Sequence, residues 1–90
     1  MKTGKIISGS FFVFRYINQT NPQYAIVAPK SVSKGAVGRN SLRRKGYTAI
    51  RSFPVDSGSG IFFYKKNANT ASYQEIKEDI GLLLKKARII

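Results

Sequence analysis

Aromatic and aliphatic residues gather in three short runs that predict β-strands. Aromatic and β-branched residues favour strands, and Asn, Pro, Ser and Gly between the runs favour turns. The connection between the first run, residues 11–16, and the second run, residues 24–28, is short and therefore predicts an antiparallel hairpin of these two strands. The first run is apolar on both faces, so we expect other parts of the protein to pack against both faces of this strand. The runs are residues 11–16 (FFVFRY), 24–28 (YAIVA) and 61–64 (IFFY).

Two later segments have helical spacing instead. The first runs from about Arg39 to Arg51, and its polar side is an arc about 100° wide that carries three arginines. In the second segment, Ser72 and Glu75 have the spacing of a capping box, which predicts a helix start. The apolar arc of the first helix is Leu42, Gly46, Ala49 and Ile50, and that of the second is Tyr73, Ile76, Ile80, Leu83, Leu84 and Ala87.

These elements predict one α+β domain over residues 1–90. We expect a sheet of three to four strands with two helices, in the order β-β-α-β-α. Residues 1–10 (MKTGKIISGS) are mixed in character and are predicted to be a lead-in loop or tail. We also expect the 11–16 strand to leave an aromatic patch exposed, which would favour self-association.

Charge narrows the possible functions. The chain has 90 residues, with 16 Lys and Arg against four Asp and Glu, and a net charge of +12. Residues 30–51 contain seven of the basic residues and no acidic one. Such a balance predicts attraction to phosphate backbones and binding that weakens steeply with salt. A merely solvated basic face is the simpler alternative.

Several classes of chemistry are disfavoured by what the chain lacks. It contains no Cys and no His, so we expect no disulfide, thiolate metal site or histidine base. Ser41 has no evident base to activate it, and no catalytic residue is predicted in the protein. The loop SVSKGAVGRN has neither the dinucleotide nor the P-loop spacing, but could hold a phosphate at a helix start.

Neither a membrane-spanning run nor a signal peptide is evident, so we expect a cytoplasmic protein without membrane contact. A cationic membrane-surface protein is a further alternative, but the last helix offers only Lys85, Lys86 and Arg88 for it. Nucleic-acid binding fits better, because arginines bind phosphates and the aromatic runs could stack bases. Composition alone leaves RNA and DNA open, and most of the rings are expected in the core.

The stretch KSVSKGAVGRNSLRR resembles the signature of the bacterial ribonuclease P protein component, which has the form A-V-x-R-N followed by basic residues on a helix. The resemblance extends on both sides. GKIISGSFFVFRYINQTNPQYAIVAPK is similar to the first hairpin of that family. SGSGIFFYKKNANTASYQEIKEDIGLLLKKA is similar to its last strand and closing helix.

The resemblance implies a left-handed β-α-β crossover that holds the arginine-rich helix. It also implies an accessory subunit of an endoribonuclease whose RNA performs the cleavage, removing the 5′ leader of precursor tRNA. The implied partners are the catalytic RNA and precursor tRNA with its leader. A cleft on the sheet would contact the leader. No DNA partner is expected. The protein alone would bind no cofactor, and magnesium would act through the RNA. A general or ribosome-associated RNA-binding protein of the same fold is the alternative.

The candidate RNA-binding residues combine the family motif with the polar arc of the first helix. Asn40 is expected to fix the loop or to contact RNA directly. The full set is Lys30, Lys34, Arg39, Asn40, Arg43, Arg44, Lys45, Tyr47, Arg51, Lys65 and Lys66.

Three departures from the family pattern stand out. Family members have a Phe-rich helix before the first strand that walls the leader cleft, and this chain is expected to be a short form without it. The basic residue that usually follows Arg-Asn is Ser41 here, and a family arginine one turn beyond Arg44 is Tyr47. These two changes reduce the number of expected phosphate contacts.

Overall fold

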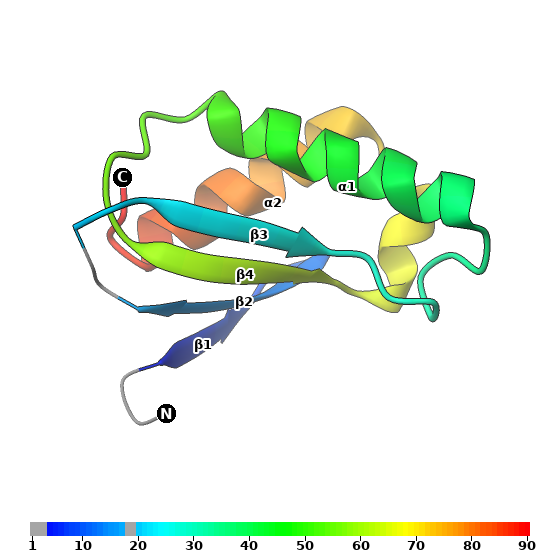
Figure 1. The fold of residues 1–90 in the computed structure, drawn as a ribbon, viewed down its shortest axis with the longest axis horizontal. Helices are drawn as coiled ribbons and strands as arrows, with labels where there is room; N and C mark the ends of the chain where they lie inside the picture. The colour runs from blue at the N-terminus through cyan, green and yellow to red at the C-terminus, as the bar shows by residue number, and fades with distance from the viewer. Residues whose placement is uncertain (1–3, 18–19) are drawn as a thin grey trace.

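A four-stranded mixed sheet carries two helices on one of its faces (Figure 1). The computed structural model describes residues 4–17 and 20–90. The α+β class and the sheet of three to four strands are as predicted, but the order of elements is β-β-β-α-β-α and so has one strand more than the predicted order. The elements are β1 (Lys5–Ser8), β2 (Phe12–Ile17), β3 (Gln23–Val27), α1 (Ala36–Arg51), β4 (Ser59–Tyr64), the 3₁₀ helix η1 (Lys66–Thr70) and α2 (Tyr73–Lys86).

The additional strand is β1. The prediction of a lead-in loop or tail over residues 1–10 is wrong for residues 5–8, and residues 1–3 lie outside the described part of the chain. β1 pairs antiparallel with β2, and Ile7 stands opposite Phe14 and packs against the core. A mixed segment such as KIIS becomes a strand here because β2 supplies the partner for its backbone.

The order of strands across the sheet is β1-β2-β4-β3. β4 pairs antiparallel with β2 and parallel with β3, so the predicted hairpin between β2 and β3 is wrong. The central place of β4 follows from its aromatic residues, because the Phe62 ring stacks on Phe14 at 4.0 Å and stands beside Ile26 of β3. Of the predicted loop between β2 and β3, residues 18–19 lie outside the described residues.

The helices bury the stripes that the sequence predicts. α1 starts at Ala36, three residues before the expected position, and its buried residues are the four predicted from spacing. The capping box of α2 is confirmed, because Ser72 Oγ accepts the Glu75 N–H at 3.2 Å and Glu75 Oε1 accepts the Ser72 N–H at 2.9 Å. The buried residues of the predicted α2 stripe are Ile76, Ile80, Leu83, Leu84 and Ala87.

α1 connects the parallel strands β3 and β4 and therefore forms a β-α-β crossover. Its left-handedness stays a prediction. The crossover matters for the site because it lays α1 along the edge strand β3, with one side of the helix in the core and the other free (Figure 1).

The two faces of the sheet differ in cover. Phe12 and Phe14 of β2 are fully buried under the helices, so the expected exposed aromatic patch over residues 11–16 is wrong for these two rings. The other face carries Val13 opposite Phe63 and Arg15 opposite Ile61, and no helix of the described chain covers it. The prediction of cover on both faces is therefore wrong for the described residues.

Candidate nucleic-acid interface

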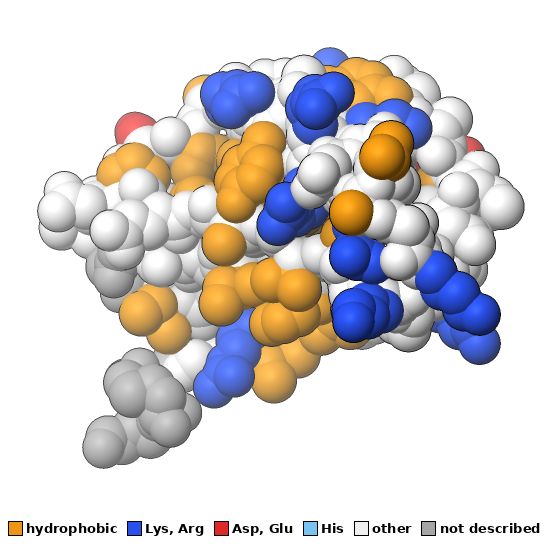
Figure 2. All heavy atoms as spheres, turned by 45° about the vertical axis from the view of Figure 1, so that its right-hand side comes forward, with side chains coloured by type: hydrophobic (Ala, Val, Ile, Leu, Met, Phe, Trp, Pro, Cys, Tyr) orange, Lys and Arg blue, Asp and Glu red, His pale blue; other side chains and the backbone are white. Residues whose placement is uncertain are grey.

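The free side of α1 is cationic. Because the helix buries Leu42, Gly46, Ala49 and Ile50, the positions between them point to solvent. Figure 2 shows Lys and Arg side chains in several groups on this side of the molecule, with acidic groups only near the rim of the view. The exposed candidates on α1 are Asn40, Arg43, Arg44, Tyr47 and Arg51, and Lys45 is half-buried.

Asn40 acts on a neighbouring arginine rather than on the loop. Arg43 Nη2 donates a hydrogen bond of 2.6 Å to Asn40 Oδ1, one helical turn away. The bond restricts the Arg43 side chain while most of its N–H groups stay free for a ligand. The expectation that Asn40 fixes the loop is therefore not met by this geometry, whereas its contact with RNA stays a prediction.

Arg39 holds the loop instead. Its Nη1 donates to the carbonyl oxygens of Ser33 at 3.1 Å and Lys34 at 2.7 Å, in the segment before α1. The side chain is half-buried, unlike Arg43 and Arg44 on the free side of the helix. Part of its donor capacity is thus engaged by the protein's own backbone.

Tyr47 is also partly used by the fold. Its hydroxyl accepts the backbone N–H of Ile26 at 3.3 Å, which gives an N–H of the edge strand β3 a partner. The side chain is still 36% exposed, so the ring can contact a ligand beside α1.

Three predicted lysines meet in an open hollow of about 480 Å³, which we call the three-lysine hollow. It lies between the segment that joins β3 to α1 and the 3₁₀ helix η1. Lys30 and Lys34 come from the first segment and Lys66 from the second. The remaining lining residues are Ser31, Val32, Ser33 and Asn69. A hollow with three ammonium groups and several hydroxyl and amide groups suits a phosphate.

Lys65 faces a different structural element. Its Nζ donates to the Gly9 carbonyl oxygen at 2.6 Å, so it anchors the turn between β1 and β2. The structure therefore separates the two candidate lysines after β4, because Lys66 lines the three-lysine hollow and Lys65 contacts the turn.

None of the four acidic residues lies in the basic stretch of residues 30–51. Asp56 is in the loop after α1, and Glu75, Glu78 and Asp79 are on α2. Asp79 is only 4% exposed and accepts the N–H groups of Ser10 at 2.8 Å and Phe11 at 2.9 Å. The Asp79 carboxylate therefore binds the backbone of the turn between β1 and β2 and is not a solvated surface group.

Two tyrosines have pKa values that burial shifts. Burial raises the pKa of Tyr64, whose hydroxyl donates to the Leu42 carbonyl oxygen at 2.5 Å, and burial also raises the pKa of Tyr24. Within the described residues, no group of three or more acidic side chains is placed to hold a metal ion. The hydroxyls of both tyrosines donate to backbone carbonyl oxygens, Tyr64 to Leu42 and Tyr24 to Ser57, so both side chains belong to the packing of the fold.

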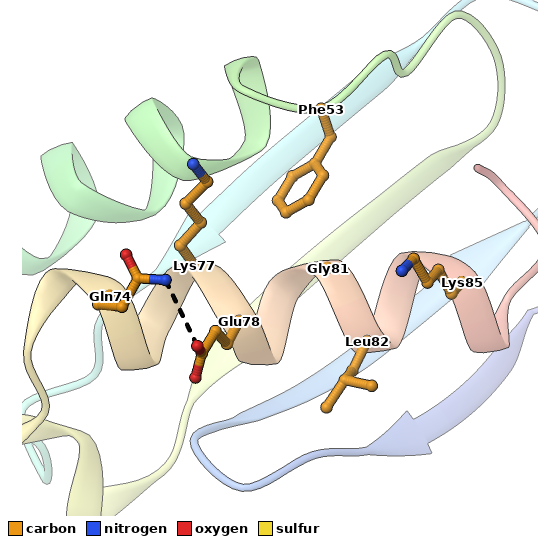
Figure 3. A pocket seen from close by; sticks show the side chains of 7 residues that line it. All are labelled: Phe53, Gln74, Lys77, Glu78, Gly81, Leu82 and Lys85. Atoms are coloured by element: carbon orange, nitrogen blue, oxygen red, sulfur yellow. Dashed lines mark hydrogen bonds between the residues drawn. The ribbon is translucent and has the colours of Figure 1, made fainter.

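A second hollow, of about 440 Å³, lies between α2 and the segment after α1 (Figure 3). Phe53 packs against Gly81 at its centre, and Lys77 and Lys85 lie on either side along α2. Glu78, which accepts from Gln74 Nε2 at 3.4 Å, also lines it. Its apolar floor and mixed charges suit phosphate less well than the three-lysine hollow does.

Arg15 is a candidate that the sequence analysis missed. It is exposed on the uncovered face of the sheet, opposite Ile61 and Ile6 in the strand register. The signal was present, because alternation along β2 puts Arg15 on the same face as Val13 and opposite to the buried Phe14. Sequence alone could not show which of the two faces the helices cover.

The fold is a small α+β domain with arginines along a crossover helix and with one sheet face that no helix of the described residues covers. These features are typical of basic proteins that bind polyanions. The chain belongs to the ribonuclease P protein family, because the family model described as Ribonuclease P matches residues 1–88. It is therefore a protein subunit of ribonuclease P, an endoribonuclease complex of tRNA processing. A comparison with curated protein sequences finds no match.

Solved structures show the same fold. The chain is similar to the RNase P protein of Staphylococcus aureus, with a TM-score of 0.83 and 19% identity, over 98% of this chain and 84% of that one. It is also similar to the RNase P protein of Thermotoga maritima, with a TM-score of 0.81 and 20% identity, over 94% of this chain and 84% of that one. None of the helices among the described residues is long and apolar enough to cross a bilayer.

Proposed function

We propose that this chain binds the catalytic RNA of ribonuclease P and precursor tRNA, including its 5′ leader, and assists removal of that leader. The RNA performs the cleavage, and magnesium acts through the RNA rather than through a protein site. The protein would work in the cytoplasm, where its RNA partners are made.

One observation carries the proposal most directly: the cations of α1 face solvent. Arg43, Arg44 and Arg51 are exposed on the side of α1 that does not pack in the core. Guanidinium groups bind phosphates through paired N–H donors, and a rigid helix keeps their spacing fixed. A folded RNA that presents several phosphates in a row can therefore engage this surface with little rearrangement of the protein.

The uncovered sheet face supports contact with the single-stranded leader. Val27 and Ile61 are exposed there, Phe63 is half-buried, and Arg15 adds a cation among them. Unpaired bases stack on apolar and aromatic side chains, and an arginine beside them binds the backbone phosphate. This arrangement suits an unpaired strand better than a duplex.

The contribution to catalysis would be electrostatic. Catalytic RNA and precursor tRNA are both polyanions and repel each other unless cations intervene. A protein of net charge +12 placed between them reduces this repulsion and so reduces the magnesium concentration that the reaction needs.

The test is cleavage of precursor tRNA by a bacterial catalytic RNA at low magnesium, with and without the protein. We expect the protein to stimulate cleavage strongly at low magnesium and much less at high magnesium. Absence of stimulation at every magnesium concentration would contradict the proposal. A precursor tRNA with a shortened leader separates the two roles, because it should lose the leader contact and keep the contact with catalytic RNA.

General RNA binding is the second candidate, and one observation favours it. Ser41 and Tyr47 stand where the family pattern has basic residues, and the Tyr47 hydroxyl is bonded to Ile26 of β3. Fewer cations on α1 leave less to distinguish one folded RNA from another. Equal affinity for catalytic RNA and for unrelated structured RNAs at the same salt would favour this candidate, whereas a preference for catalytic RNA would reject it.

A further inference from the structure

The segment before α1 is fixed by three contacts from different sources. Val32 is 3% exposed and anchors the segment in the core. Its N–H donates to the Pro29 carbonyl oxygen at 3.0 Å, which closes a tight turn. The guanidinium of Arg39 then bonds the carbonyl oxygens of Ser33 and Lys34 through a single nitrogen. The backbone that carries Lys34 is therefore held from the core side and from the helix side.

These contacts determine the shape of the three-lysine hollow. Ser33 and Lys34, whose carbonyls Arg39 binds, both line the hollow, whereas Arg39 itself is not among its lining residues. Without Arg39, the segment between Val32 and α1 would lose these two hydrogen bonds to a helix side chain. Several lysines share one phosphate more favourably when their backbones are already held at fixed distances, because less conformational entropy is then lost on binding.

We propose that Arg39 acts on RNA indirectly, as a positioning residue that keeps the three-lysine hollow in shape as a phosphate subsite. This inference rests on the proposed function. The ligand is a phosphate group held by Lys30, Lys34 and Lys66, and its source is the backbone of RNA. Arg39 and Lys34 thus act as one unit, whereas Arg43, exposed on the free side of α1, acts independently of the hollow.

If Arg39 positions Lys34, the effects on RNA binding of removing these two side chains should not add. Residues that act as one unit give non-additive effects, whereas separate contacts add. If Arg39 were one more surface cation, Arg39→Ala and Lys34→Ala would each remove about one phosphate contact, and the double variant about two. If Arg39 positions Lys34, the double variant loses about as much as either single variant.

The experiment measures binding of catalytic RNA over a series of salt concentrations for Arg39→Ala, Lys34→Ala and the double variant. We expect the slope of log affinity against log salt to fall by about one in all three. Arg43→Ala with Lys34→Ala is the matched pair of equal charge, and its slope changes should add to about two. A fall of about two for the Arg39 and Lys34 double variant, or no fall in either single variant, would overturn the proposal.

Arg39→Lys separates position from charge. The charge is kept, but a lysine ammonium sits on a flexible stem, whereas the planar guanidinium of Arg39 directs a single nitrogen, Nη1, at both carbonyl oxygens. We expect Arg39→Lys to lower the slope nearly as much as Arg39→Ala, with the melting curve still cooperative. Full recovery of the slope by lysine would show that only the charge matters and would overturn the positioning role.

A separate titration identifies the source of the phosphate. Backbone amide signals are followed by NMR while dimethyl phosphate, an analogue of the RNA backbone, or inorganic phosphate is added at constant ionic strength. We expect dimethyl phosphate to shift the amides of residues 30–34 and 66–69 in the native chain but not in Arg39→Ala. Shifts with inorganic phosphate alone, or only along α1, would contradict an RNA backbone subsite.

Failure of this inference can be told apart from failure of the proposed function. If the native chain binds catalytic RNA with steep salt dependence but the slopes add, only the positioning role of Arg39 is rejected. If the native chain does not bind catalytic RNA, the proposed function itself is rejected, and the positioning role with it.

Discussion

Asp79 stabilises the fold from a buried position, although an aspartate in a helix is more often exposed to solvent. It lies on the apolar side of α2, between Ile76, Ile80 and Leu83, and binds two N–H groups of the turn after β1. The helical spacing of the sequence already placed it on that side, so its burial could have been predicted. Its partners could not, because they are nearly 70 residues away and only the folded chain brings them close.

Removal of that carboxylate should destabilise the protein. Asp79→Ala leaves the N–H groups of Ser10 and Phe11 without their acceptor, and hydrogen bonds to a charged group contribute about 1.5–3 kcal/mol each. For the two bonds together we expect a loss of about 3–6 kcal/mol in the free energy of unfolding, measured in urea. Glu78→Ala, at an exposed position of the same helix, is the control and should change it by less than about 0.5 kcal/mol. Equal effects of the two changes would contradict the assigned role.

Tyr64 should make stability fall at alkaline pH. Burial raises its pKa above the ordinary value of 10.0, so the unfolded chain loses the phenolic proton at a lower pH than the folded chain does. The stabilisation is complete below pH 10.0 and decreases as the pH rises above it. Tyr64→Phe should lose about 1 kcal/mol at neutral pH, with its bond to Leu42, and should show a smaller decrease above pH 10.0. Identical pH profiles for the two proteins would contradict this explanation.

At the scale of elements, the sequence predicted the helices better than the sheet. Capping and spacing are local, so the buried stripes of α1 and α2 follow from residues within a few turns. Strand pairing is not local. β2 and β3 are joined by a short connection, yet β4, more than 30 residues later, lies between them. Packing of Phe62 against Phe14 favours that order, and no short-range pattern contains it.

Gly46 illustrates the same point within α1. A glycine inside a helix costs about 1 kcal/mol relative to alanine, and its reason is the close approach of β3. A Cβ atom at this position would lie 2.9 Å from Ile26 Cδ1 and 3.1 Å from Cγ2. The sequence suggested close packing but could not name the neighbour.

Gly46→Ala should therefore destabilise the protein despite the better helix propensity of alanine. We expect a net loss of up to about 2 kcal/mol in unfolding free energy, because overpacking costs about 1–3 kcal/mol and the better helix propensity returns about 1 kcal/mol. Thr48→Ala, at an exposed position of the same helix, should be neutral or slightly stabilising. A stabilised Gly46→Ala would show that Ile26 moves aside easily and that the approach of helix and strand is not tight.

At the scale of the whole molecule, the sequence indicated a cationic surface. It did not indicate which basic side chains are free to bind a ligand and which form hydrogen bonds within the protein. The basic stretch before and along α1 was evident from composition. Several of the candidate side chains form hydrogen bonds within the protein instead. Arg39 bonds to the segment before α1, Lys65 to the turn at Gly9 and Tyr47 to β3, and these tertiary contacts do not follow from the sequence. The exposed remainder, with Arg43 and Arg44 on one side of α1, forms the surface on which the proposed function depends.

The most direct test compares two double variants that change the net charge equally. Arg43→Ala with Arg44→Ala removes two cations from α1, and Lys85→Ala with Lys86→Ala removes two from the end of α2. Affinity for catalytic RNA is measured over a series of salt concentrations. We expect the α1 pair to lower the salt slope by about two and the α2 pair to lower it little. Equal changes for both pairs, or no change for the α1 pair, would contradict the claim that α1 carries the RNA-binding surface.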